Sequence, residues 1–259
     1  MAIQPTTVAS AAPSESGGGP RFLRRAADLA RLVRSGHGGS VVRAVTRRLA
    51  SRSRALGLRR DLRLLHPAPP AKIDLVVRPL AADDDLSFLD PHTDGLDSGA
   101  AYDRMVQRRF VADGFSTCYV AVAPDGKICF MQWLLASRDN ERIQSRWPGL
   151  FPLLAPDEAL LEGAYTVETS RGKGVMAHGM ARVAEHAVEL GARWVITFVG
   201  EDNIASLKGC RKAGFVPWVE RRESWRLFRR RVRFTPLPEG TPYPFEAAGA
   251  GGAPPNASS

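Results

Sequence analysis

Short runs of apolar residues, several of them alternating with polar ones, recur after residue 72 and predict β-strands. The predicted strands cover residues 73–79, 117–123, 127–136, 160–169, 193–199, 215–222 and 224–234. Between them, apolar residues recur at helical spacing, which predicts helices over residues 102–112, 176–190 and 203–212. Residues 138–156 have no clear periodicity. Strands that alternate with helices and end in a hairpin indicate an α/β protein with a mixed sheet covered by helices on both sides.

The pattern is different near the two ends of the chain. Apolar residues recur at helical spacing among arginines in residues 21–66, so we expect a basic extension of two short amphipathic helices there. Residues 67–71 read as a proline-rich linker to a folded domain at residues 72–235. Residues 1–20 and 236–259 are rich in small residues and proline, and we expect both to be disordered.

The net charge of +9 is concentrated in the predicted basic extension. Residues 21–66 hold thirteen arginines against Asp28 and Asp61, a charge of +11, so the remainder of the chain carries −2. Basic amphipathic helices can lie on an anionic membrane surface, dock on an acidic partner or bind nucleic acid, and they can also present a merely solvated face. Aromatic residues for base stacking are nearly absent in this segment, so nucleic acid is the least favoured partner.

The sequence also indicates where the protein resides. It has no apolar run of the roughly 18 residues that a membrane span needs, and it has no secretory signal pattern. Three cysteines without CxxC spacing do not suggest a disulfide framework or a zinc site, and His178 and His186 have no evident third metal ligand. We therefore expect a cytoplasmic protein without a metal, peripherally attached to the inner face of the membrane if the basic extension binds lipid.

The clearest chemical signal is a loop at a junction between a predicted strand and a predicted helix. It reads Arg171, Gly172, Lys173, Gly174, Val175, and the predicted helix follows from Met176. Glycines allow a tight turn and leave backbone N–H groups accessible, and the start of a helix favours an anion. A phosphate or pyrophosphate is the ligand that such a loop suits, although loops of this composition are also common as plain solvated turns.

A second segment follows about thirty residues later. It contains Asn203 and Ser206 on a predicted helix that ends shortly before Gly214 and Phe215, where a predicted strand begins. Together, the loop and this segment resemble the GCN5-related N-acetyltransferase (GNAT) family, in which a loop of Gln or Arg, two residues, Gly, one residue, and Gly or Ala binds coenzyme A. The resemblance covers about residues 73–234, and it departs from the family at Met176, where a small residue is usual.

The resemblance implies a mostly antiparallel mixed sheet with acetyl-CoA bound in a wedge between two strands, here residues 160–169 and 193–199. The cofactor arm would lie along the backbone of Ala164, Tyr165 and Thr166, and Asn203 and Ser206 would support it. Its pyrophosphate would meet the amides of Gly172, Lys173, Gly174, Val175 and Met176, with added charge from Arg171 and Lys173.

The resemblance also implies where the catalytic residues lie. Glu162 stands near the position of a family general base. Cys210 occupies the place of the usual tyrosine acid. Three alternatives for the proton remain open: the Cys210 thiol, the Tyr165 hydroxyl, or no dedicated acid, with Cys210 serving only for packing. Glu168, near the phosphate end, is expected to be a solvated carboxylate at the end of a strand.

The function that follows is an N-acyltransferase, moving acetyl or a short acyl group from acyl-CoA to a primary amine by direct attack in a ternary complex. The acceptor is unidentified. An amino sugar or cell-surface glycan precursor is suggested by the resemblance of the leader to those of polysaccharide-cluster members of the family, and a small amine, a protein N-terminus or a lysine are the other candidates. A non-catalytic acyl-CoA-binding module docked through its basic leader is the alternative, and a nucleic-acid-binding protein ranks last.

Overall fold

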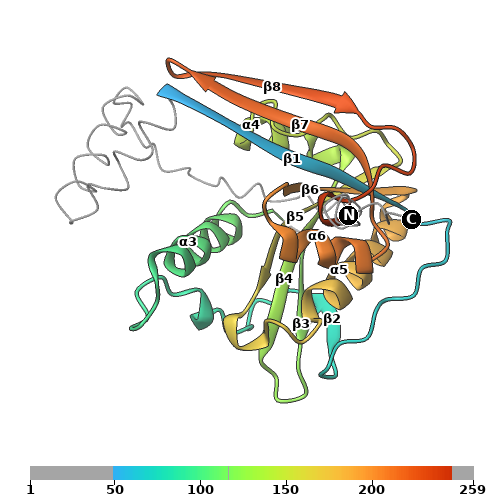
Figure 1. The fold of residues 1–259 in the computed structure, drawn as a ribbon. Coiled ribbons are helices and arrows are strands. Elements are labelled where there is room, and N and C mark those ends of the chain that lie inside the picture. The colour runs from blue at the N-terminus through green and yellow to red at the C-terminus, as the bar shows by residue number, and fades with distance from the viewer. Residues whose placement is uncertain (1–48, 116, 247–259) are drawn as a thin grey trace, which may run out of the picture. The chain divides into compact units, whose positions relative to one another are not determined.

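An eight-stranded sheet organises the chain (Figure 1). The computed structural model describes residues 49–115 and 117–246. The strand order is β2-β3-β4-β5-β6-β1-β7-β8, in which β5 and β6 run parallel while the pairs β1/β6, β2/β3, β3/β4 and β4/β5 are antiparallel. The strands are β1 (Ala50–Asp61), β2 (Val76–Pro79), β3 (Cys118–Val122), β4 (Ile128–Ala136), β5 (Glu158–Thr166), β6 (Trp194–Gly200), β7 (Val216–Arg226) and β8 (Arg229–Pro236).

Helices cover both faces of this sheet. They are α3 (Ser98–Ala112), α4 (Asn140–Arg146), α5 (Val175–Glu185) and α6 (Ile204–Lys212), with short 3-10 turns η1 (Ser87–Leu89), η2 (Ser137–Asp139), η3 (Glu168–Ser170) and η4 (His186–Leu190). The α5 and α6 helices pack on one face with Phe130 and Leu134 of β4, while α3 and α4 pack on the other with Met131 and Trp133. Successive residues of β4 therefore point to opposite faces, and the predicted fold class is confirmed.

The chain divides into two compact units. The larger comprises described residues 52–224 and 230–246, and it contains every residue of the candidate site described below. In the smaller, residues 49–51 lie with residues 225–229, and Leu227 N donates to Leu49 O at 3.0 Å.

The segment at residues 50–61 is a strand, so the prediction of a helical extension through residue 66 is wrong there. This strand, β1, pairs with β6 from Ala55↔Gly200 to Asp61↔Trp194, and Leu58 is fully buried. The spacing of leucines and arginines in this segment is compatible with either a helix or a strand, and pairing with β6 in the sheet selects the strand. The predicted start of the domain at residue 72 is therefore wrong as well, whereas residues 21–48 lie outside the described chain.

Arginines of this segment are engaged by the fold. Arg60 is buried and donates to His66 O at 2.8 Å and to Ala181 O at 3.2 Å. Arg59 places its guanidinium 4.5 Å from the ring centroid of Trp194. These side chains therefore contribute to packing rather than to a free basic face.

The predicted linker and tail also differ from expectation. The segment at 67–71 lies against α5, where His178 Nδ1 is 2.9 Å from Pro69 O, and the next residue, Lys72, donates its backbone N–H to Lys173 O in the loop before α5 at 2.8 Å. The tail is ordered up to residue 246, because buried Tyr243 donates its hydroxyl proton to Phe215 O at 2.7 Å. The predictions for residues 1–20 and 247–259 concern residues outside those described.

Helix α4 lies in the stretch that has no clear periodicity in the sequence, and Ile143 is its only buried residue. Within the described ranges, no helix has both the length and the apolar content required to span a bilayer.

Candidate functional site

The candidate site is a wedge where two parallel strands separate. Strands β5 and β6 pair only from Glu158↔Trp194 to Leu160↔Ile196, although β5 continues to Thr166 and β6 to Gly200. A cleft of about 260 Å³ lies in the resulting gap and is lined by both strands. The wedge expected between residues 160–169 and 193–199 is thus present.

This cleft reaches both faces of the sheet. Gln107 and Phe110 line it from α3, which packs on one face, while Met176 and Met180 line it from α5, which packs on the other. Two molecules can therefore approach the wedge from opposite sides of the sheet.

A β-bulge shapes the wall of the cleft. Met131 pairs with Tyr165 and Trp133 pairs with Glu162, so the single residue Gln132 faces both Gly163 and Ala164. Gly163 has a φ of +65°, and a Cβ there would lie 2.9 Å from Trp133 Cε3. Only glycine fits this conformation and this space, and the bulge fixes Glu162 beside an irregular, less fully paired stretch of strand.

Glu162 is half-buried and lines the cleft. Burial raises its pKa to about 7, while the positive charge of Arg221 and a hydrogen bond from the Gly163 backbone act in the opposite direction. Arg221 is held in place because it donates to Leu150 O at 3.0 Å and its guanidinium lies 4.9 Å from the Phe198 ring centroid. A carboxyl group with this pKa exchanges a proton readily near neutral pH.

The glycine-containing loop leads directly into α5. Gly174 has a φ of +78° and precedes Val175, and no side chain of the described residues caps the helix start. Backbone amides of the first turn therefore remain available to an anion. The side chain of Met176 lies against α6, since a Cβ on Gly209 would be 3.1 Å from its Sδ atom. Gly209 thus provides the space that the unexpected methionine requires.

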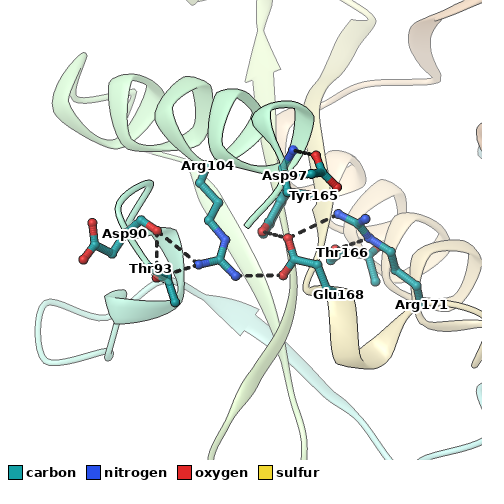
Figure 2. Close-up of polar contacts among 9 residues, drawn as sticks. Asp90, Thr93, Asp97, Arg104, Tyr165, Thr166, Glu168 and Arg171 are labelled. Carbon is teal, nitrogen blue, oxygen red and sulfur yellow. Dashed lines mark hydrogen bonds and ion pairs between the residues drawn. The ribbon is translucent and has the colours of Figure 1, made fainter. Parts of the chain in front are cut away.

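Glu168 is the centre of a polar network, not a solvated carboxylate as expected (Figure 2). It accepts hydrogen bonds from Arg104 Nη2 at 3.1 Å and from the Tyr165 hydroxyl at 2.9 Å. Arg171 Nη2 lies 3.5 Å from the same carboxylate, and Arg171 Nε donates to Thr166 O at 3.1 Å. Burial alone would raise the pKa of Glu168, but hydrogen bonds from Arg104, from its own backbone and from Tyr165 together hold the pKa below its usual value.

The network joins the segment before α3 to the predicted phosphate loop. Arg104 also donates to Asp90 O at 3.1 Å and to Thr93 Oγ1 at 3.0 Å, as Figure 2 shows. If Arg171 moved toward a phosphate, it would leave Glu168, and the contact of Arg104 with the same carboxylate would change as a result.

The other predicted site residues divide between the cleft and the core. Ala164, Asn203 and Ser206 line the cleft, and Asn203 Oδ1 accepts from Ser206 N at 3.1 Å at the start of α6. Cys210 is fully buried in the core and does not line the cleft, and burial raises the pKa of its thiol to about 12. This placement fits the packing alternative rather than a proton donor.

Tyr165 offers no better proton donor to the cleft. Its hydroxyl is bound to Glu168, its ring stacks on Phe88 with centroids 6.3 Å apart, and burial raises its pKa to about 12. Neither of the two candidate acids, Cys210 or Tyr165, therefore lines the cleft.

Sequence reasoning missed several polar residues of this region: Arg104, Gln107, Gln132 and Arg221. For Gln132 a signal was available, because it is the one polar residue of the strand from Ile128 to Ala136. A polar side chain in an otherwise apolar strand indicates either a partner in the core or a ligand. Arg104 gave no such signal, since arginine is common on amphipathic helices.

No protein-family model and no curated protein matches the chain. Among solved structures, it is similar to a GCN5-related N-acetyltransferase from Sphaerobacter thermophilus, at 14% identity, with 78% of this chain and 58% of that chain covered and a TM-score of 0.43. It is also similar to a GNAT-family acetyltransferase from Colwellia psychrerythraea, at 13% identity, with 74% and 59% covered and a TM-score of 0.41.

A third similar structure is the GCN5-related glucosamine N-acetyltransferase region of a fungal multidomain β-N-acetylglucosaminidase. The identity is 12%, the coverage is 68% of this chain and 21% of that chain, and the TM-score is 0.49. The chain thus spans less than two thirds of the length of each of these three proteins. All three TM-scores are below 0.5, so the proposed function rests on the residues of the site and not on these similarities.

Proposed function

We propose that this protein is an N-acyltransferase that moves an acetyl or other short acyl group from acyl-CoA to a primary amine by direct attack in a ternary complex. The observation that carries the proposal is the cleft between β5 and β6. It reaches both faces of the sheet, it is lined by Glu162 with a pKa of about 7, and the start of α6 contributes to its wall.

The acyl donor would enter from the α5 and α6 face. Its pyrophosphate would accept hydrogen bonds from the amides of residues 172–176, with charge from Arg171 and Lys173. Its arm would extend along residues 164–166, beyond the point where β5 and β6 stop pairing, with Asn203 and Ser206 alongside. Arg171 would exchange its contact with Glu168 for one with phosphate.

The amine would enter from the α3 face as an ammonium and lose one proton to the Glu162 carboxylate, which passes it to solvent. The neutral nitrogen would then attack the thioester carbon, so that a C–N bond forms, and the nitrogen would lose its remaining excess proton as the tetrahedral intermediate collapses and the C–S bond breaks. The thiolate leaves with the sulfur electron pair and takes up a proton from solvent, so that one proton is released overall. This assignment requires no dedicated acid, in keeping with the buried position of Cys210.

The acceptor that we propose to test first is an amino sugar or a related glycan precursor, ahead of simple amines and lysine side chains. We also propose that the arginine-rich leader, which comprises the residues from 21 up to the start of β1, docks the protein on a membrane surface or a protein partner.

The test uses the full chain, because β1 is part of the sheet. Calorimetry measures acetyl-CoA binding, and free-thiol release with pooled amines then measures turnover in the same sample. Binding with amine-dependent release supports the transferase. Binding without release favours the non-catalytic acyl-CoA-binding module, and the absence of binding overturns both readings.

A further inference from the structure

Two buried side-chain amides in the cleft have no apparent role in the fold. Gln132 of β4 is fully buried, and neither its Nε2 nor its Oε1 atom has a hydrogen-bond partner among the described residues. Gln107 of α3 is 6% exposed, and its Oε1 atom likewise lacks a partner within the described chain. Both line the same cleft as Glu162.

Unpaired buried amides are costly, so a protein rarely retains them without a reason. An apolar side chain of the same size would fill either position without this cost. Such groups are expected at functional sites, where the missing partner is supplied by a ligand.

The two amides lie on opposite faces of the sheet. The neighbours of Gln132 along β4, Met131 and Trp133, point toward α3, so Gln132 itself points toward the α5 face. Gln107 belongs to α3 and lines the cleft from the other face, near Phe110. Each amide therefore faces a different entrance of the wedge.

We propose that Gln132 hydrogen-bonds the arm of the acyl donor and that Gln107 recognises a hydrogen-bond donor on the amine acceptor. This inference rests on the proposed function and specifies how its two substrates are held. Gln132 offers two N–H donors and one oxygen acceptor, which suit the carbonyl and amide groups of an acyl-CoA arm. It lies one residue from Trp133, the partner of Glu162, at the level where the thioester must be attacked.

Gln107 selects the chemical class of the acceptor. Its Oε1 atom can only accept a hydrogen bond, so the acceptor must supply an O–H or N–H group near the reacting amine. Phe110 and Phe198 provide the apolar walls around this position. A hydroxylated amine therefore fits this side of the cleft better than a plain alkylamine does.

The experiment compares full-length wild type with Gln132→Met and Gln107→Met, which keep side-chain size and remove the amide. We expect Gln132→Met to weaken acetyl-CoA binding about tenfold in calorimetry, and Gln107→Met to leave that affinity unchanged. In thiol-release assays, wild type should acetylate 2-aminoethanol about tenfold more efficiently than propylamine, which has a methyl group in place of the hydroxyl, and Gln107→Met should lose this preference. Each variant is the control for the other.

Thermal unfolding separates a ligand-binding role from a structural one. Because the fold supplies no partner for these atoms, both variants should keep or raise Tm. A lower Tm with unchanged acetyl-CoA affinity and unchanged amine preference would show that the amides serve the fold and would overturn the proposal. If wild type acetylates both amines equally well, the assignment of Gln107 fails. If wild type binds acetyl-CoA but releases no thiol with either amine, the result favours the non-catalytic module and the transferase proposal fails with it; if it does not bind acetyl-CoA at all, the proposed function itself fails.

Discussion

The titration of Glu162 gives the sharpest prediction for the proposed reaction. A carboxyl group with a pKa of about 7 is roughly one tenth ionised at pH 6 and roughly nine tenths ionised at pH 8. The kcat/KM for amine acetylation should therefore rise about tenfold over this interval if Glu162 is the general base. Glu162→Gln should lower kcat/KM by roughly 10²- to 10⁴-fold and remove this step from the pH profile.

Arg221 allows the titration of Glu162 to be distinguished from that of the amine itself. The positive charge of Arg221 holds the pKa of Glu162 below the value that burial alone would give. Arg221→Met should therefore move the midpoint of the profile to higher pH, whereas Arg221→Lys should keep it near that of wild type. A midpoint that is the same in Arg221→Met as in wild type, or a pH step that survives in Glu162→Gln, would refute the assignment of Glu162 as the base.

Stability provides a second readout that does not depend on activity. The pKa of Glu162 is raised in the folded protein, so its contribution to stability is full below its unfolded pKa of about 4.5 and is lost as the pH rises through about 7. Glutamine does not titrate. The Tm of Glu162→Gln relative to wild type should therefore increase between pH 4 and pH 8, and a constant difference would argue against a raised pKa.

Three further predictions test the loop, the polar network and the C-terminal segment. Gly174→Val should reduce acetyl-CoA affinity at least about tenfold in calorimetry, because a Cβ there would lie 3.2 Å from Pro70 O at a φ of +78°, whereas Gly126→Val, at a φ of +81° in a remote turn, should leave affinity unchanged. Arg104→Met should lower the free energy of unfolding in urea by about 2 kcal/mol, and Arg108→Met, whose contact with Asp90 is exposed, by less than about 0.5 kcal/mol; equal losses would contradict the importance of the network. Tyr243→Phe should cost about 1 kcal/mol by the same measurement, while Tyr102→Phe, which is 60% exposed, should cost almost nothing; no loss for Tyr243→Phe would indicate that the segment does not stabilise the fold.

The parts of the fold that could be predicted from sequence are those defined by local signals. The loop before α5 combines glycines, charge and a change of period within a few residues, and the structure has a tight turn and a helix start there. Strands β3 and β4 were predictable because the turn at residues 124–126 separates two apolar runs. Glu162 could be singled out because the family resemblance implies a carboxylate on that strand, nine residues before Arg171, and in the structure Glu162 lines the cleft.

The remaining features depend on partners that are distant in sequence. Residues 50–61 look helical in isolation and become a strand because β6 pairs with them. Glu168 looks solvated until Arg104, 64 residues earlier, reaches it from α3. Cys210 occupied a position where the family resemblance suggested chemistry, and only the packing of the core around it showed that the thiol is enclosed.

The central position of β1 has a consequence for how the chain must be made. This strand is synthesised well before its neighbour β6, which follows some 130 residues later, and before β7. Until β6 and β7 have been synthesised, Leu56 and Leu58 of β1 have no sheet to pack into. As long as β1 is not paired with β6, the edge of β6 is free to pair with any other exposed strand. A fragment that begins after residue 61 would retain the wedge residues but carry open edges on β6 and β7, so we expect such a fragment to aggregate.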